Sequence, residues 1–400
     1  MRVLVCNIGS TSFKFRYFDM DGEKVLARGG IERVGFHNAT MKFYVGDEKT
    51  PKVEKTEFIP TQSQAVELCL NFLREIFGDL TEIKAVGFKT VQAGEENGSV
   101  LLTERVIAAM EKYSPLAPAH NPPYIQAILM FDRLLPEIPL VGVFEPGFHT
   151  GRPEYASVYG APYEWYKKYG LRKYGYHGAS LRYVTGETIR ILGLDPKVHK
   201  IIACHLGGSS SVCAYKDGRS VDTSMGLTPQ SGVPQSNRVG DIDAFAIPFI
   251  MKKTGFSMEE VFHELVTNGG LKGISGTSGD MRDILEEIEK GGPLADRCRL
   301  ARAKLIYDIK FYMGAYILLM GGVDAVCFSG GIGQKEAMLR AEVLCSLDFL
   351  GFVLDEAANM RGEQIISTPN STIKAVVLET NEEIIVARET VRVVNGKKEE

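Results

Sequence analysis

Two stretches of the chain repeat one pattern, and this repeat limits the possible folds more than any other feature. VLVCNIGSTSFKF spans residues 3–15, and IIACHLGGSSSVCAY spans residues 201–215. Each runs from aliphatic residues through Cys and a polar residue to Gly and a cluster of Ser and Thr, then returns to an apolar segment. A chain of 400 residues is too long for one ordinary core and suits two domains. The repeat therefore predicts two halves, each opening with an antiparallel strand-turn-strand.

Strand and helix signals alternate through most of the remaining sequence. QAVELCLNFLREIFG places apolar residues on one helical face and stops at Gly78. The apolar segment IKAVGF follows, then helical patterns at 104–113 and 123–135, and then the strand-like LVGVF. Strands separated by helices predict helix-covered sheets, which is an α/β architecture.

Charge and composition exclude several classes of function. The net charge is only −4, so we expect no nucleic-acid partner and no anionic membrane surface. The seven cysteines are scattered without a CxxC pair, which favours buried free thiols in a reducing cytoplasm. No signal peptide is predicted. The apolar stretch 311–328 is broken by Gly321, Gly322 and Asp324, so we expect a buried helix and strand there rather than a membrane span.

The Gly-Ser/Thr turns of the repeat are suited to phosphate oxygens. A strand that feeds such a turn presents backbone N–H groups and short hydroxyls without bulky side chains, and Lys14 adds a positive charge beside the first turn. One such turn alone would suggest a plain β-hairpin, but two copies favour a pair of anion-binding loops. A third loop, CFSGGIGQKE, carries Gly330, Gly331 and Gly333 between a strand and a helix. It matches neither a Walker A loop nor a GxGxxG fingerprint, and such loops are also common structural joints.

Nine phrases together resemble the acetate kinase family, within the acetate and sugar kinase, Hsc70 and actin superfamily. They are NIGSTSFK, LAPAHNPP, YGYHGAS, CHLGGSSS, VDTSMGLTP, NRVGDID, SGTSGDMRDI, FSGGIG and TNEEIIVARET. The resemblance implies two actin-like, ribonuclease H-like domains from an internal duplication, flanking a nucleotide cleft. The expected domains are residues 1–149 with 384–400, and residues 150–383. It also implies ATP/ADP and Mg²⁺ as cofactors, a small carboxylate substrate, and a cytoplasmic homodimer.

The resemblance assigns roles to particular residues. Arg238, His177 and Glu145 stand at catalytic positions, and the alternative for Arg238 is a structural ion pair with Asp241 or Asp243. Asn7 and Glu382 stand at positions associated with magnesium, although a capping box from Thr380 to Glu383 would also explain acidic residues there. The nucleotide-binding positions are Lys14, His205, Gly207, Gly208, Ser209, Asp280, Arg282, Gly330, Gly331 and Gly333. The substrate-binding positions are Lys89, Val91, Ala119, His120, Tyr176 and Pro229.

Departures from the family pattern gather at the substrate-binding positions. Lys89 replaces an arginine, Glu145 replaces a catalytic aspartate, and Gln92 and Leu181 replace histidines. Ala119 stands where leucine is usual, and Tyr176 where phenylalanine is usual. Lysine keeps a cation but loses the bidentate fork that clamps a carboxylate. We therefore expect a divergent member of the family with an altered substrate corner.

Three functions follow as alternatives. The first is transfer of the γ-phosphoryl group of ATP in line to acetate or another short-chain carboxylate, which yields ADP and an acyl phosphate. The second is the same chemistry on a larger or more polar acid such as propionate, butyrate or a hydroxy acid. The third is a non-catalytic actin-like regulator that only binds nucleotide. A sugar kinase would need a base to deprotonate a hydroxyl, and Glu145 could serve as one.

Overall fold

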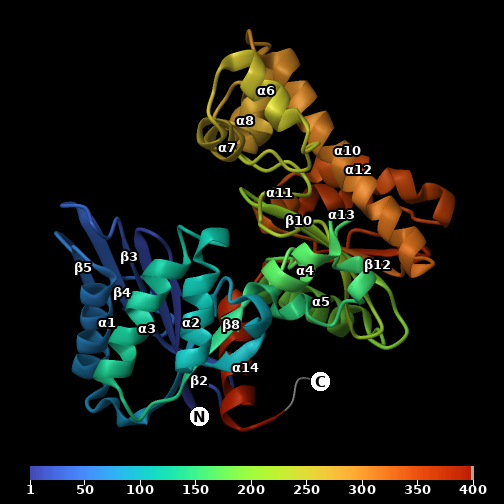
Figure 1. The fold of residues 1–400 in the computed structure, drawn as a ribbon. Coiled ribbons are helices and arrows are strands. Elements are labelled where there is room, and N and C mark those ends of the chain that lie inside the picture. The colour runs from blue at the N-terminus through green and yellow to red at the C-terminus, as the bar shows by residue number, and fades with distance from the viewer. Residues whose placement is uncertain (398–400) are drawn as a thin grey trace. The chain divides into compact units, whose positions relative to one another are not determined.

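The computed structural model describes residues 1–397 and divides the chain into two compact units. Unit 1 holds Met1–Thr150 and the chain from Asn381 onward, and unit 2 holds Gly151–Thr380 (Figure 1). Residues 398–400 of the expected span 384–400 lie outside the described residues. Each unit has its own sheet with helices packed against it, so the predicted α/β class is confirmed.

Unit 1 is built on an eight-stranded sheet in the order β5-β4-β3-β2-β1-β6-β8-β7. Its strands are β1 (Arg2–Ile8), β2 (Ser12–Asp19), β3 (Lys24–Glu32), β4 (Ala39–Val45), β5 (Val53–Glu57), β6 (Ile83–Thr90), β7 (Ser99–Leu101) and β8 (Leu140–Phe144). β1 pairs antiparallel with β2 and parallel with β6. The strand-turn-strand predicted at the start of the chain is therefore present, and its turn lies at one end of the central strand.

Helices cover both faces of this sheet. They are α1 (Gln62–Phe77), α2 (Glu104–Lys112), α3 (Asn121–Leu134) and α14 (Glu382–Val394). α1 and α3 lie side by side on one face, where the rings of Phe88 and Phe131 meet at 5.4 Å between centroids (Figure 1). α14 packs on the opposite face at Gly87, where an added Cβ would lie 2.2 Å from Thr390 Oγ1. Because only glycine permits this approach, Gly87 lets the middle of α14, at Val386 and Thr390, pack close to β6.

Unit 2 is built on a five-stranded sheet in the order β11-β10-β9-β12-β13. Its strands are β9 (Ile201–Leu206), β10 (Ser210–Lys216), β11 (Arg219–Thr223), β12 (Ala325–Ser329) and β13 (Lys374–Val377). β9 pairs antiparallel with β10 and parallel with β12. The opening of the second half thus repeats the arrangement of β1 and β2.

Unit 2 is rich in helices, and the long apolar segment of the sequence lies inside it. The helices are α4 (Tyr163–Tyr169), α5 (Gly178–Leu192), α6 (Ala246–Thr254), α7 (Met258–Thr267), α8 (Gly270–Ser275), α9 (Met281–Lys290), α10 (Ala295–Met320), α11 (Gly330–Lys335), α12 (Ala337–Leu344) and α13 (Glu356–Arg361). Residues 311–328 form the end of α10 and most of β12, as predicted. Within residues 1–397 no helix has the length and apolar character needed to cross a membrane.

Six of the seven cysteines are buried free thiols, and Cys345 is exposed, which corrects the expectation for that residue. Cys345 begins a short 3₁₀ segment after α12 rather than occupying a strand or a helix core. Burial raises the pKa of the Cys213 thiol to about 12. Thiols in such surroundings are poor nucleophiles, so cysteine chemistry is no part of the candidate site.

Candidate functional site

Three predicted residues from distant parts of the chain meet in unit 1. Lys89 lies near the end of β6, Glu145 follows β8, and Glu382 is the first residue of α14. The Lys89 Nζ lies 2.9 Å from Glu145 Oε1 and 2.7 Å from Glu382 Oε2. The three side chains are 18%, 8% and 20% exposed, respectively. One ammonium group therefore joins two largely buried carboxylates.

The electrostatics of this cluster keep the lysine charged. Burial by itself would lower the pKa of Lys89, because it disfavours the charged form. The two carboxylates outweigh burial and hold the pKa of Lys89 well above its usual value. Lys89 is thus a fixed cation held between a predicted catalytic residue and a predicted metal ligand.

Asn7 lies beside this cluster at the end of β1. Cys6 pairs with Phe88 across β1 and β6, so Asn7 and Lys89 are the next residues of two neighbouring strands. The Tyr124 hydroxyl donates to Asn7 Oδ1 at 3.3 Å. The amide oxygen of Asn7 and the carboxylate of Glu382 are the hard oxygen ligands that Mg²⁺ prefers.

The amide oxygen of Asn7 and the carboxylate of Glu382 fit a magnesium ion whose other ligands are phosphate oxygens and water. No group of three or more His, Cys, Asp or Glu residues suited to a metal occurs among residues 1–397. Mg²⁺ commonly takes only one or two protein ligands and fills its shell with water and phosphate oxygens. The capping box expected from Thr380 is wrong, because Asn381 caps α14 and its Oδ1 accepts from Ile384 N at 3.2 Å. Glu382 thus makes no part of the cap, although the first turn of α14, where it lies, also favours an acidic residue.

The remaining substrate-binding candidates of unit 1 lie around the start of α3. His120 is the residue before α3, and its side chain makes no capping hydrogen bond to that helix. Ala119 is exposed and Val91 is half-buried. Gln92 is fully buried, and its Oε1 accepts from Gly94 N at 2.8 Å. Gln92, which stands where the family pattern has a histidine, therefore orders the loop after β6.

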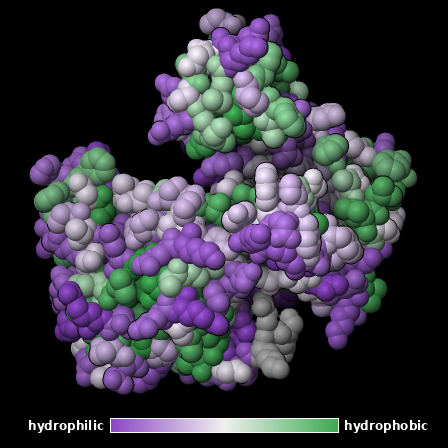
Figure 2. Space-filling model, in the orientation of Figure 1, coloured by the Kyte–Doolittle hydropathy of each residue, from purple (hydrophilic) through white to green (hydrophobic). Residues whose placement is uncertain are grey.

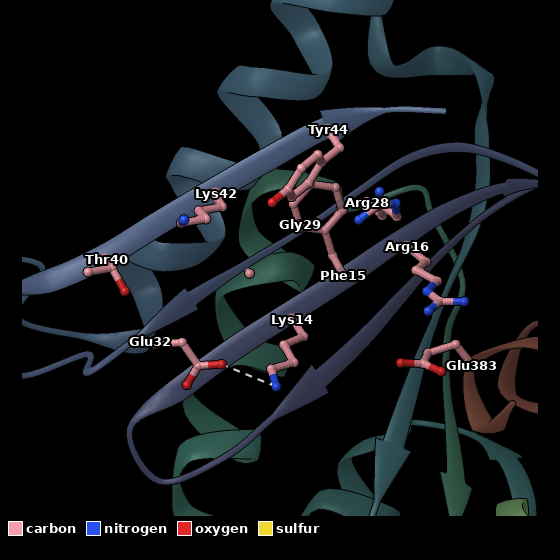
Figure 3. A pocket seen from close by; sticks show the side chains of 11 residues that line it. Lys14, Phe15, Arg16, Arg28, Gly29, Glu32, Thr40, Lys42, Tyr44 and Glu383 are labelled. Carbon is pink, nitrogen blue, oxygen red and sulfur yellow. Dashed lines mark ion pairs between the residues drawn. The ribbon is translucent and has the colours of Figure 1, made fainter. Parts of the chain in front are cut away.

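Lys14 lies on the face of the unit 1 sheet that α1 and α3 leave uncovered. Its Nζ is 3.1 Å from Glu32 Oε1, and the two residues line a pocket of about 340 Å³ with Arg16, Arg28 and Lys42 among its other walls (Figure 3). Figure 3 shows Lys14 and Glu32 pointing toward one another across two neighbouring strands. Lys14 is thus exposed and engaged with a carboxylate, rather than embedded in the β1–β2 turn.

The glycine-rich loops of unit 2 meet in one pocket. It measures about 430 Å³. Its walls are Gly207, Gly208, Ser236, Asp280, Met281, Arg282, Leu285, Gly331, Ile332, Lys335 and Glu336. Gly330 has a φ of 76°, and a Cβ there would lie 2.4 Å from the Leu206 carbonyl oxygen. Gly330 therefore lets the β12–α11 loop sit against the end of β9, which brings both glycine loops to the same pocket.

Asp280 and Arg282 lie at the start of α9 and also line this pocket. Asp280 caps α9 through Arg282 N at 2.9 Å, and it pairs with the Arg282 guanidinium at 3.0 and 2.6 Å. These hydrogen bonds, led by the guanidinium, hold the pKa of Asp280 at about 2. The pair remains a fixed, charged wall of the pocket across the neutral pH range.

Arg238 lies in a hydrogen-bond network that joins three predicted residues. Its Nη1 donates to Ser209 Oγ and to Gln235 Oε1, both at 3.2 Å. Ser209 also donates to Gln235 Oε1 at 2.7 Å, and Gln235 Nε2 donates to the Pro229 carbonyl oxygen at 2.6 Å. Burial lowers the pKa of Arg238. The network therefore fixes the partly buried guanidinium of Arg238 next to Ser209, in the glycine loop between β9 and β10.

The ion pair considered as an alternative for Arg238 does not form. Asp241 accepts instead from Gly232 N at 2.8 Å and from the Tyr312 hydroxyl. Asp243 accepts from Phe245 N at 2.9 Å. Among residues 1–397 no carboxylate pairs with Arg238, so its positive charge is available to a ligand.

Two histidine rings lie close together beside this network, tilted at 38° to one another. The rings of His177 and His205 lie 4.3 Å apart between centroids. His177 Nδ1 hydrogen-bonds to Ser211 at 2.9 Å, and His205 Nδ1 hydrogen-bonds to Ser180 at 2.7 Å. His177 adopts a φ of 60°, which is uncommon for a residue with a side chain and costs free energy. This geometry holds both rings at the N-terminus of α5.

The other substituted positions in unit 2 are packed. The Tyr176 hydroxyl donates to the Leu227 carbonyl oxygen at 2.7 Å, so it orders the loop before Pro229. Leu181 is completely buried in α5. Gly333 is buried in α11, where a Cβ would contact Phe328 at ordinary distances. Leu181, which stands where the family pattern has a histidine, is thus a core residue in this chain.

Sequence reasoning missed three residues that hold the predicted ones in place. Gln235 joins Ser209, Arg238 and Pro229, and it is fully buried. Tyr124 binds Asn7, and Gln62 binds the β1–β2 turn. Buried polar residues at the edge of a glycine turn are a usable signal in a structure. In the sequence, however, Gln235 lies between two motifs with no pattern of its own.

Comparison with known proteins matches nearly the whole chain. The family model for the acetokinase family matches residues 2–388. A curated acetate kinase of Bacteroides fragilis is 42% identical, over 99% of this chain and 100% of that protein. The crystal structure of Porphyromonas gingivalis acetate kinase has a TM-score of 0.90 and 36% identity, covering 98% of this chain and 99% of that one. A propionate kinase structure from Francisella tularensis has a TM-score of 0.88 and 32% identity, with the same coverage. An identity of 42% along the full length does not bear out the expectation of a divergent sequence.

Proposed function

The chain belongs to the acetokinase family, and on that basis we propose that it transfers the γ-phosphoryl group of ATP to acetate. The products are ADP and acetyl phosphate. Arg238 is the observation that carries this proposal. Its guanidinium has no carboxylate partner among the described residues and is hydrogen-bonded beside the glycine-lined pocket. A protein that only binds nucleotide has no need of such a cation.

The reaction needs positioning and positive charge more than it needs a base. A simple carboxylic acid has a pKa of about 4, so acetate is already ionised at neutral pH. One acetate oxygen forms a bond to the γ-phosphorus while the bond from that phosphorus to the β–γ bridging oxygen breaks, and the electron pair leaves with ADP. Charge spreads over three equatorial oxygens during this transfer, and a planar guanidinium stabilises such oxygens through paired N–H groups.

We assign the nucleotide to unit 2. The pocket lined by Gly207, Gly208 and Gly331 would take the adenosine and the phosphates, because bare glycine loops allow phosphate oxygens to approach backbone N–H groups. Asp280 and Arg282 would border the adenosine. His177, fixed by Ser211, would donate to the transferring phosphoryl group.

We assign the carboxylate and the metal to unit 1. Lys89 would attract the acid, and Asn7 and Glu382 would hold Mg²⁺ through oxygen ligands. Mg²⁺, when bound, neutralises phosphate charge and helps to keep the reacting groups in line. Glu145 keeps Lys89 charged and oriented at 2.9 Å, so we propose that its carboxylate acts through the lysine.

A larger acid remains a second candidate, and the surroundings of His120 favour it. Ala119, beside His120, is exposed and small, so its side chain would leave room for a larger acid. Lys89 offers one ammonium point charge where a forked guanidinium would fix a carboxylate in one orientation. Both features would tolerate an acid with a longer chain.

A substrate panel tests the proposal directly. Purified protein with ATP and Mg²⁺ is given formate, acetate, propionate, butyrate, hydroxy acids, glycerol and hexoses, and hydroxylamine traps any acyl phosphate. We expect acyl hydroxamate from acetate, with ADP formed in equal amount and a loss of activity in Arg238→Ala. Transfer to glycerol or a hexose would indicate a sugar kinase. ADP release without any acyl product, or no turnover at all, would reject the carboxylate-kinase proposal.

We also propose that the protein is a homodimer that associates through unit 2. The exposed apolar side chains Phe249, Met258 and Phe262 lie on α6 and α7, on the surface where Figure 2 shows hydrophobic residues gathered over α6–α8. Tyr307, Phe311 and Leu318 are exposed at helical spacing along α10. Apolar surface of this extent on helices is typical of subunit interfaces. Light scattering on wild type and Phe249→Glu tests this, with a dimer expected for the former and dissociation for the latter.

A cytoplasmic location is part of the same proposal. Six buried free cysteines suit a reducing compartment. Detection of the activity in a cytoplasmic fraction, separated from membranes and from secreted protein, tests it.

A further inference from the structure

The Tyr124 hydroxyl occupies a buried position between α3 and the end of β1. It accepts a hydrogen bond from Ile8 N at 2.9 Å and donates to Asn7 Oδ1 at 3.3 Å. Tyr124 is 1% exposed, so water does not compete for these bonds. None of the motifs recognised in the sequence accounts for a tyrosine at this position.

The bond to Ile8 gives β1 a hydrogen-bond partner beyond the last β1–β6 pair, while Ile8 still pairs with Phe13 of β2. The paired positions of β1 and β6 end at Cys6 and Phe88. Ile8 lies two residues further along and is 1% exposed. A buried backbone N–H needs a partner, and the tyrosine oxygen supplies it. Tyr124 therefore fixes the last residue of β1 before the Gly-Ser/Thr turn.

The same hydroxyl decides which end of the Asn7 amide points toward it. A phenol has a single proton to donate. If the Asn7 nitrogen faced Tyr124, the amide would donate to the phenol oxygen, and the buried phenol proton would have no acceptor in this pair. The carbonyl oxygen of Asn7 is thus the atom that matches the tyrosine. One of its lone pairs meets the hydroxyl, and the other remains for a second partner.

The turn that follows is held from the same side by α1. Gln62 Nε2 donates to the Gly9 carbonyl oxygen at 3.0 Å and approaches the Ser12 carbonyl oxygen at 3.4 Å. Gly9 N donates to Ser12 O at 2.8 Å across the turn. The region from Asn7 to Ser12 is therefore anchored by one side chain from each of two helices, and it does not need a ligand to order it.

We propose that Tyr124 is a positioning residue that presents the Asn7 amide oxygen, already oriented, to the metal–nucleotide complex. The inference rests on the proposed function and deepens it, because Asn7 is assigned there to Mg²⁺. Preorganised contacts of this kind are gained on binding without the cost of ordering them. Removal of the hydroxyl leaves Asn7 in place but free to rotate.

The test compares Tyr124→Phe with Tyr17→Phe. Tyr17 lies in β2 opposite Leu4, near the other end of the β1–β2 pair, and is 2% exposed, so its change removes a hydroxyl from another buried tyrosine of the same unit. Mn²⁺ binding in the presence of ADP, measured by electron paramagnetic resonance, reads the metal site without turnover. We expect about tenfold weaker Mn²⁺ binding and a similar rise in the Mg²⁺ concentration for half-maximal rate in Tyr124→Phe. A tenfold change is about 1.4 kcal/mol, the size expected for one hydrogen bond. We expect neither change in Tyr17→Phe.

A double-mutant cycle with Asn7→Ala separates positioning from general damage. If Tyr124 acts through Asn7, Tyr124→Phe adds nothing to the Mn²⁺ affinity of Asn7→Ala. An equal tenfold loss in both backgrounds would overturn the inference, and so would unchanged Mn²⁺ binding in Tyr124→Phe. Metal-free ADP binding, assigned to unit 2, should be the same in all variants, and hydrogen exchange of peptides from β1, β2 and α3 reports whether unit 1 is folded. If wild type binds Mn²⁺ with ADP and obeys this cycle but phosphorylates no acid, the positioning role stands and the proposed function fails.

Discussion

Replacing Lys89 by methionine removes the one cation between two carboxylates while keeping most of the side-chain volume. In wild type, Glu145 and Glu382 lie 2.9 and 2.7 Å from Lys89 Nζ. Loss of one partner from a buried ion pair costs about 3–5 kcal/mol, because a charge remains buried without compensation. Glu382 is 20% exposed and can recover some hydration, so we expect the lower end, about 3 kcal/mol.

Hydrogen exchange read by mass spectrometry is the suitable assay, because two units need not unfold together. Peptides from β6, β8 and α14 should exchange roughly a hundredfold faster in Lys89→Met at pH 7.5, since each 1.4 kcal/mol is a factor of ten. Lys14→Met is the matched control. The Lys14–Glu32 pair is 55% and 54% exposed, and such pairs contribute at most about 1 kcal/mol. Lys89→Arg should restore most of the protection.

The pH dependence has a definite sign. The pKa of Lys89 is raised in the folded state, so its stabilising contribution is complete below the unfolded value of about 10.4 and is lost only as pH rises past it. The contribution of Lys89 to hydrogen-exchange protection in wild type should therefore stay constant from pH 6 to pH 9. In Lys89→Met, protonation of either carboxylate relieves their repulsion, so the difference from wild type should shrink as the pH falls. Equal protection of the two proteins at pH 7.5 would refute the reasoning.

Three further substitutions probe unit 2. Arg238→Ala should lower kcat by about a thousandfold, the range for an arginine on a transferring phosphoryl group, while Arg238→Lys recovers little; unchanged turnover in a steady-state assay would disprove the role. Gly330→Ala should lower the thermal unfolding midpoint through the clash with the Leu206 carbonyl and the positive φ, at a cost of about 1–3 kcal/mol. Gly331→Ala should leave the thermal unfolding midpoint unchanged, because Gly331 has open space around it. Equal midpoints for Gly330→Ala and Gly331→Ala by calorimetry would contradict this explanation of the loop. Gln235→Leu should reduce kcat about tenfold by releasing the Arg238 guanidinium, and a wild-type kcat would show that Arg238 needs no such support.

The sequence was most informative where the cause of a structure is local. The two strand-turn-strand openings follow from alternating apolar residues and a Gly-Ser turn, and both appear as β1–β2 and β9–β10. The helix end at Gly78 was predicted for the same reason, and its φ of 76° agrees. The glycine loops that line the pocket of unit 2 could be identified in the sequence, because the conformation of such a loop depends on its own backbone.

Nonlocal partnerships could not be predicted from the sequence. Lys89, Glu145 and Glu382 come from three separate elements, and no spacing in the chain relates them. The cap of α14 was misassigned because Thr380 and Asn381 are both good capping residues, and packing chose Asn381. Gln235 gave no signal because a buried glutamine between motifs looks like any loop residue until its partners are known.

The placement of α14 has a consequence for how the protein is made. Unit 1 begins at Met1 but receives its last helix only from Asn381 onward, after all of unit 2 has left the ribosome. Until then β6 lacks the helix that fits against Gly87, and Lys89 has Glu145 but not Glu382. A polypeptide truncated before α14 would therefore lack Glu382, the proposed metal ligand, as well as part of the packing of unit 1. The Lys89 cluster can therefore form in full only after α14 has been synthesised.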